Sequence, residues 1–213
     1  MLDFMMLDGV LTVTETVPRK SCKTIEISHD DLFFCNGNVI FDNMKIADLE
    51  APQFVHFMLH PTSIQFEKCD DSPAFYQRIS ALTNFGAIQL TINNTSKICF
   101  KTIFKAFPNT TNMWLSTRLP DGWMTEIAQH QKTMLTKLAV LGKGTIGAFT
   151  SSEIDLLLKR QSKQFKMGLT LFEPTPLLIK RVESELDRSL KRMNPEENGR
   201  VFLIHNGVIV VYE

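Results

Sequence analysis

The chain has 213 residues, of which 44% are hydrophobic and 22% charged, with 23 basic and 23 acidic side chains. A chain of this length and composition can bury a core without disulfides or metals, which excludes the disordered and the disulfide-stapled classes. The zero net charge argues against steering of the whole protein onto nucleic acid or an anionic membrane, but not against a local basic face.

The first half of the sequence favours antiparallel strands. Residues 23–28 alternate apolar and polar side chains, as does a half-buried strand. Asn36 and Gly37 stand between two apolar runs, and such a pair predicts a tight hairpin because a type I′ turn needs positive φ at both central residues. Residues 55–67 predict two more strands, with Pro61 in the turn between them.

Helical patterns begin in the middle of the chain. Ser72 followed by Pro73 predicts a capped helix that stops near Gly86. Residues 86–92 predict a strand, and a short helix follows that ends at Pro108. Apolar stripes predict three further helices, at residues 125–141, 151–166 and 176–193. Asn206 and Gly207 predict a closing hairpin at residues 200–213.

These elements predict an α+β fold with a mainly antiparallel sheet in the first half, three amphipathic helices in the second half and a C-terminal β-hairpin. We expect a single domain over residues 1–213, with residues 117–122 as the only place for a weak subdivision. We find no internal repeat in the sequence.

Gly142, Gly144 and Gly147 form a G-x-G-x-x-G pattern. Our preferred interpretation is a helix end, with Gly142 as the left-handed C′ residue, followed by a turn. The alternative is a dinucleotide loop, which requires residues 138–141 to be a parallel strand and Glu173 to receive a ribose. A kinase loop is excluded because the downstream lysine, H-R-D and D-F-G signatures are missing from the sequence.

The sequence predicts no catalytic, metal or cofactor site. His56 and His60 are four residues apart, but we expect them on a strand, where they lie too far apart to bind one metal. The four cysteines form no C-x-x-C pair, and we expect them to be free thiols in an intracellular, cytoplasmic protein, with the nucleus as an alternative.

Basic residues are dense near the end of the last predicted helix. We expect them to bind a partner, although acidic residues between them also fit a solvated helix face. The candidate partner-binding residues are Lys180, Arg181, Arg188, Lys191 and Arg192.

Several short stretches occur in a recognisable order. The matching residues are Leu90, Thr91, Ile92, Phe100, Lys101, Thr102, Trp114 and residues 138–142. In this order the chain resembles the matrix proteins of animal rhabdoviruses over about half its length. The resemblance implies a viral, non-enzymatic assembly protein that binds membrane and nucleocapsid. The chain departs from that family in its neutral charge and in lacking a basic N-terminal tail and the P-P-x-Y or P-T-A-P motifs.

The sequence therefore predicts a non-enzymatic interaction or assembly protein that acts through its surfaces. We expect a protein partner, self-association through the apolar C-terminal hairpin, and contact of the local basic face with a membrane surface or a ribonucleoprotein. We expect no small-molecule substrate. The alternative is a small nucleotide- or dinucleotide-binding protein that uses residues 142–147.

Overall fold

The computed structural model describes residues 1–213 apart from residues 8–9, 16–22, 95–97, 144–145 and 195. The strands of the described part are β1 (Leu2–Leu7), β2 (Val10–Glu15), β3 (Lys23–Thr24), β4 (Phe33–Cys35), β5 (Asn38–Asp42), β6 (Phe57–Leu59), β7 (Ser63–Glu67), β8 (Gln89–Asn93), β9 (Asn112–Leu115), β10 (Lys137–Lys143), β11 (Lys166–Phe172), β12 (Arg192–Met193), β13 (Val201–His205) and β14 (Val208–Tyr212).

Its helices are α1 (Pro73–Leu82), α2 (Phe100–Ala106), α3 (Trp123–His130), α4 (Ser151–Lys159) and α5 (Pro176–Ser189), with the 3₁₀ helices η1 (Ile46–Glu50) and η2 (Pro52–His56).

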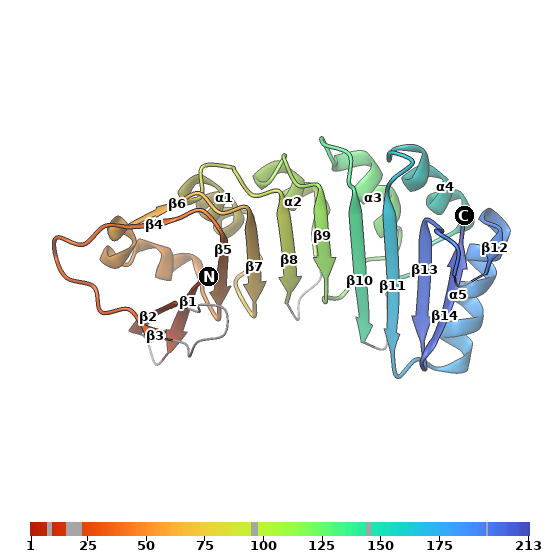
Figure 1. Cartoon of the computed structure of the whole chain (residues 1–213), viewed down its shortest axis with the longest axis horizontal. Coiled ribbons are helices and arrows are strands. Elements are labelled where there is room, and N and C mark those ends of the chain that lie inside the picture. The colour runs from red at the N-terminus through yellow and green to blue at the C-terminus, as the bar shows by residue number, and fades with distance from the viewer. Residues whose placement is uncertain (8–9, 16–22, 95–97, 144–145, 195) are drawn as a thin grey trace.

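One long sheet of twelve strands runs the length of the molecule, in the order β12-β14-β13-β11-β10-β9-β8-β7-β5-β1-β2-β3 (Figure 1). The strands from β1 through β5, β7, β8, β9, β10 and β11 to β13 are all parallel to their neighbours. Antiparallel pairing occurs at the two ends, in β1–β2–β3 and in β13–β14–β12. The fold is therefore mixed α/β with a mostly parallel sheet and a C-terminal hairpin, and the expected mainly antiparallel sheet is wrong.

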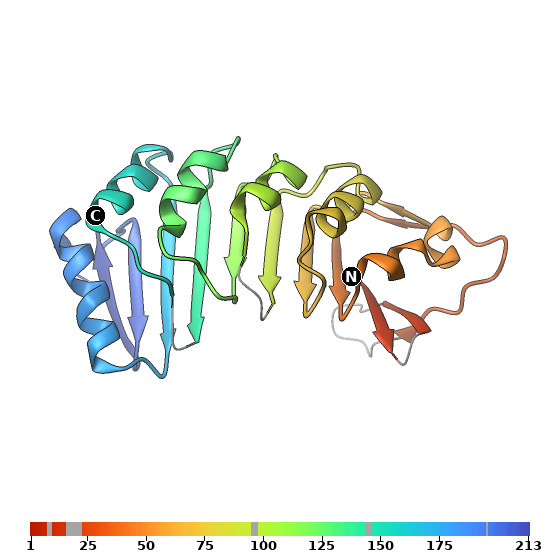
Figure 2. The ribbon, with the colours of Figure 1, turned by 180° about the vertical axis from the view of Figure 1, so that it is seen from behind.

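In the part of the chain that the structure describes, all five α-helices lie on one face of this sheet (Figures 1 and 2). Alternate residues of each strand point to that covered face and are buried against the helices. On neighbouring strands, for example, Leu90 lies beside Met113 and Leu138 beside Met167, and all four are 0% exposed. The core is thus a layer of apolar side chains between the sheet and one row of helices.

Successive parallel strands are also neighbours in space, so the middle of the molecule is a linear stack of strand–helix units. Each unit from β5 to β11 occupies about 25 residues and contacts mainly the units beside it. The expectation of no repeat is therefore wrong at the level of structure. The repeat escapes notice in the sequence because each unit needs only apolar side chains at covered positions, and Leu, Ile, Phe, Met and Val all serve there.

The predicted hairpin at Asn36 and Gly37 is wrong, whereas the one at Asn206 and Gly207 is confirmed. Asn206 and Gly207 both take positive φ, 47° and 78°, and join the antiparallel strands β13 and β14. Gly37 is not among the described residues with positive φ, and β4 and β5 leave the turn for different sheets. Here β4 pairs in parallel with β6, and β5 pairs in parallel with β1 and β7. Of the strand expected at residues 23–28, only Lys23–Thr24 forms.

All five predicted helices exist, with corrected ends. The Ser72 side chain accepts the Phe75 N–H at 3.2 Å and caps α1, as the sequence predicts. The helix expected over residues 125–141 is wrong in its second half, because α3 ends at His130 and residues 137–143 form β10. Likewise α4 ends at Lys159 instead of residue 166. The loop at residues 117–122 joins β9 to α3, and β9 and β10 pair directly across it.

Candidate functional site

The face of the sheet opposite the helices carries none of the described α-helices. Parallel sheets usually carry helices on both faces, so one bare face across seven parallel pairs is unusual. We call this surface the open face. It is formed by the alternate strand residues that point away from the helices, in particular Asp3, Ile40, Asp42, Gln65, Glu67, Gln89, Thr91, Asn93, Asn112, Trp114, Lys137, Ala139, Leu141, Lys166, Gly168, Thr170, Phe172, Phe202, Ile204 and Ile209.

The N-terminal end of the open face is acidic. Asp3, Asp42 and Glu67 lie on the adjacent strands β1, β5 and β7. Burial, reinforced by the charges of Asp42 and Glu67, raises the pKa of Asp3 above its usual value. Within the described part of the chain, the Oδ1 atoms of Asp3 and Asp42 are buried and have no hydrogen-bond partner. Among the described residues, no cation forms an ion pair with these three carboxylates.

The middle of the open face is polar and uncharged. Strand β8 presents Gln89, Thr91 and Asn93, and β9 presents Asn112 opposite Gln89. These side chains are planar amides or hydroxyls, which both donate and accept hydrogen bonds. The middle therefore offers hydrogen bonds without selecting a charge.

The C-terminal end of the open face is apolar and has two lysines along its border. The Nζ of Lys137 lies 5.3 Å from the centre of the Trp114 ring, and the Nζ of Lys166 lies 5.7 Å from that of Phe202. Lys166 also donates to the Gly199 carbonyl at 2.6 Å, which fixes its position.

Small residues separate the two aromatic rings. Ala139 and Gly168 occupy the same row as Trp114 and Phe202, on the strands between them. A Cβ built on Gly168 would meet no atom within 4 Å, so the space above this residue is empty. In this row, the two small residues Ala139 and Gly168 therefore leave a depression between the two aromatic rings.

The glycine pattern at residues 142–147 lies beside this sheet, and our preferred interpretation of it is wrong. Residues 138–141 belong to a parallel strand, as the dinucleotide alternative requires, and Gly142 is the sixth residue of that strand instead of a helix C′ residue. Gly144 lies outside the described residues. Packing explains the other two glycines: a Cβ at Gly142 would lie 2.1 Å from the Ile146 Cγ2, and a Cβ at Gly147 would lie 2.4 Å from the Pro120 carbonyl oxygen.

The N-terminus of α4, where a pyrophosphate would bind, is already occupied by carboxylates. Thr150 and Glu153 form a capping box, and the Thr150 N–H donates to the Glu153 carboxylate at 2.8 Å. The Ser151 N–H donates to Glu185 from α5 at 2.9 Å. The sheet also has no change of strand order beside β10, where dinucleotides bind in doubly wound folds. The geometry does not fit a phosphate loop.

The five basic residues expected to bind a partner are all exposed and lie on or just after α5. Two of them carry counter-charges: Arg188 pairs with Glu185, and Arg192 donates to both carboxylate oxygens of Asp187 at 2.6 and 2.7 Å. The hydrogen bond from Arg192 lowers the pKa of Asp187. In the described part of the chain Lys180 and Lys191 form no ion pair, so they remain the most available cations of this set.

The expected strand that holds both His56 and His60 is wrong, because His56 ends η2 and His60 follows β6. The Nδ1 of His56 lies 2.9 Å from the Asp31 carbonyl oxygen, and the exposed His60 lies beside the Phe34 ring. Among the described residues, no group of three His, Cys, Asp or Glu side chains is placed to hold a metal. Cys35 and Cys69 are buried and Cys99 is exposed, and all three are free thiols, while Cys22 lies outside the described residues.

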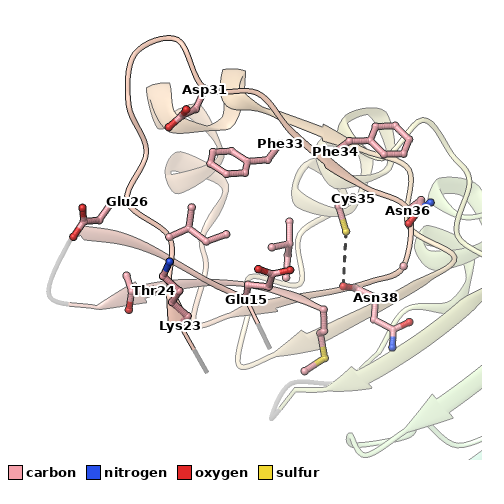
Figure 3. Close-up of a pocket in the computed structure, with 14 residues that line it drawn as sticks. Glu15, Lys23, Thr24, Glu26, Asp31, Phe33, Phe34, Cys35, Asn36 and Asn38 are labelled. Carbon is pink, nitrogen blue, oxygen red and sulfur yellow. Dashed lines mark hydrogen bonds between the residues drawn. The ribbon is translucent and has the colours of Figure 1, made fainter. Parts of the chain in front are cut away.

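A cavity of about 740 Å³ opens at the N-terminal end, between β2, β3 and the segment that leads into β4 (Figure 3). The Glu15 carboxylate and the Cys35 thiol point into it from opposite walls (Figure 3). Asp31 also lines the cavity, but its carboxylate accepts the Ser28 N–H at 2.7 Å and so stabilises the local turn. The described lining contains no histidine, and the Cys35 thiol lies nearest to the Asn38 carbonyl, at 3.9 Å. The cavity thus lacks a thiol–base pair.

No protein-family model, curated protein or solved structure matches this chain. None of the described helices is both long and apolar enough to cross a membrane. The function of the chain must therefore be inferred from the site itself.

The open face is not among the predictions from the sequence, although residues 63–67 and 89–93 carry a signal for it. Polar side chains alternate with apolar ones in both segments, which shows that one face of these strands is solvated.

Proposed function

We propose that this chain is a non-enzymatic interaction protein that binds a protein partner through the open face. The observation that carries the proposal is a sheet whose described helices all cover one face and leave the other face bare from β5 to β11. Stacked strand–helix units use such extended surfaces to bind other macromolecules.

The make-up of the open face supports binding over catalysis. Among the described side chains, its titratable groups are three carboxylates and two lysines, and both lysines lie over aromatic rings. Along the described strands the open face has no cysteine or histidine from which to build a nucleophile and its base. Its apolar end instead supplies aromatic side chains, which are enriched in the energetically important parts of interfaces.

Three earlier predictions remain proposals beside this one. Lys180 and Lys191 supply a second, charge-driven contact, either to the partner or to a membrane or ribonucleoprotein surface. The C-terminal hairpin takes part in self-association, and its Val208 and Ile209 are about half exposed (50% and 49%). The free thiols favour an intracellular location. The resemblance to rhabdovirus matrix proteins stays a prediction, and the open-face proposal does not depend on it.

Site-specific photo-crosslinking tests the proposal in the cells that express the protein. A photoreactive phenylalanine analogue replaces Gln89 or Thr91 on the open face, and matched controls carry it at Gln77 on α1 or Lys101 on α2, which are exposed on the helical side. We expect protein adducts from the two open-face positions and few from the controls. Adducts of equal yield from all four positions, or only from the helical side, would contradict the proposal.

A further inference from the structure

We infer that the partner of the open face is a polypeptide segment with a basic residue for the acidic end and an apolar residue for the aromatic end, about seven residues apart in an extended chain. This inference rests on the proposed function and specifies the chemistry of its partner.

In the part of the chain that the structure describes, the carboxylates of the acidic end form no ion pair. Asp3, Asp42 and Glu67 crowd three carboxylates onto adjacent strands, and two of their oxygens are buried without a donor. The mutual repulsion of these groups is a cost that the folded protein carries alone. An arginine or lysine from a partner lowers that cost by bringing a positive charge beside the carboxylate oxygens that remain accessible.

The other end of the face selects an apolar side chain. Gly168 leaves empty space between the Trp114 and Phe202 rings, and Leu141 and Ile204 extend the apolar surface along the same strands. From β8 to β14 the open face has no carboxylate among its described side chains, and Lys137 and Lys166 lie at its border over the two rings. A side chain placed over Gly168 therefore contacts ring faces and methyl groups.

The separation of the two ends sets the spacing. Five strand-to-strand steps lead from β5 to β11, which is about 24 Å at roughly 4.8 Å per step. An extended chain advances about 3.3 Å per residue, so about seven residues span this distance. The amides and hydroxyls of β8 and β9 lie under the middle of such a segment and can bond to its backbone.

A second copy of this chain does not satisfy both ends. A two-fold pair of open faces centred on the sheet lays acidic end over apolar end if the axis runs along the strands, where the two lysines already contact Trp114 and Phe202. It lays acidic end over acidic end if the axis runs across the strands. A pair centred on β11 joins the apolar ends but leaves the carboxylates without a cation. The charge pattern therefore favours a different polypeptide.

Selection from a display library of random dodecapeptides tests this inference without knowledge of the natural partner. We expect the full-length protein to enrich peptides with Arg or Lys about seven positions from a large apolar residue. The affinity of a selected peptide is then measured by fluorescence anisotropy for the double variant Asp42→Asn/Glu67→Gln and for Gly168→Phe. The control is Glu196→Gln, which removes one carboxylate from an exposed loop.

The double variant should bind the selected peptide at least tenfold more weakly than the unchanged protein does. A peptide whose basic residue is replaced by Gln should bind the double variant and the unchanged protein with equal affinity. Gly168→Phe should also weaken binding at least tenfold, while Glu196→Gln should bind normally. Enrichment of acidic or purely apolar peptides, or full affinity in both open-face variants, would overturn the inference. So would sedimentation showing that the free protein dimerises through the open face. If open-face adducts form in cells but selected peptides lack the basic residue, the proposed function survives and this inference fails.

Discussion

The two faces of the sheet use the same strands and the same backbone, yet follow different rules. On the covered face nearly every described strand residue is apolar and buried, and its identity hardly matters as long as it fills the space under a helix. On the open face charge, hydrogen-bonding capacity and ring position change along the stack, from the acidic cluster near β5 to the aromatic row near β11. The covered face therefore stabilises the fold, and the open face holds the charged, polar and aromatic side chains that distinguish this protein from any other stack.

The largest loss of stability is expected when the C-terminal end of the stack is removed. Deletion of residues 200–213 removes β13 and β14, with the buried Val201, Leu203 and Tyr212, and leaves the edge of β11 unpaired. We expect insoluble or unfolded protein, as measured by soluble yield and circular dichroism. A soluble truncation with a cooperative thermal transition would show that the hairpin is peripheral.

Neighbouring residues of β11 should differ strongly. Leu169 is 0% exposed on the covered face, so Leu169→Ala should lower the free energy of unfolding by about 3 kcal/mol. Thr170 points to the open face, and Thr170→Ala should change it by less than about 0.5 kcal/mol. Urea unfolding of both variants gives the comparison. Equal losses would mean that the open face is packed as tightly as the covered one.

Two strand glycines form a second matched pair. Gly142→Ala places a Cβ against Ile146 on the covered face and should destabilise the protein by about 1–3 kcal/mol. Gly168→Ala meets no atom within 4 Å, and a strand interior favours alanine by roughly 0.5–1 kcal/mol, so this variant should be as stable as the unchanged protein or more so. If Gly168→Ala is the more damaging of the two, something covers the open face.

The smallest effects concern two carboxylates whose pKa values shift in opposite directions. The folded protein binds a proton at Asp3 more tightly than the unfolded chain does, so this group lowers stability as pH rises through its raised pKa. Asp3→Asn should therefore increase the melting temperature at pH 7, with a gain that shrinks toward the ordinary pKa of 3.8.

Asp187 has the opposite sign. The hydrogen bond from Arg192 lowers the pKa of Asp187, so the ionised carboxylate stabilises the folded protein fully at pH values above the ordinary pKa of 3.8. This stabilisation is lost as the pH falls through the lowered pKa. Asp187→Asn should cost about 0.5 kcal/mol at pH 7, as exposed pairs do. Melting curves between pH 3 and pH 7 measure both variants, and a shift of the same sign for both would contradict the assigned causes.

The sequence predicts the local elements better than the way they pair. All five helices, the Ser72 cap and the hairpin at Asn206 and Gly207 follow from local rules, because caps, apolar stripes and turn residues act within a few positions. Parallel pairing depends on contacts between residues some 25 positions apart, which leave no local mark.

The direction of the sheet was misjudged for a physical reason. Residues 63–67 and 89–93 alternate apolar and polar side chains, and this pattern usually marks an antiparallel sheet with one wet face. In this protein the sheet with one solvent-exposed face is parallel. Toward the C-terminal end the open face is itself apolar, so Leu138, Ala139, Val140 and Leu141 form a continuous run that a helix pattern fits equally well.

The most direct test of the central claim, that one face of the sheet is bare, is cysteine labelling along β11. Single cysteines replace Gly168, Leu169, Thr170 or Leu171 in a protein that also carries Cys22→Ser, Cys35→Ser and Cys99→Ser. Burial of the remaining Cys69 raises its pKa to about 11, so it contributes little thiolate at pH 8. We predict that maleimide labels positions 168 and 170 rapidly and positions 169 and 171 slowly. Slow labelling at all four positions would show that the face is covered, and would contradict the account.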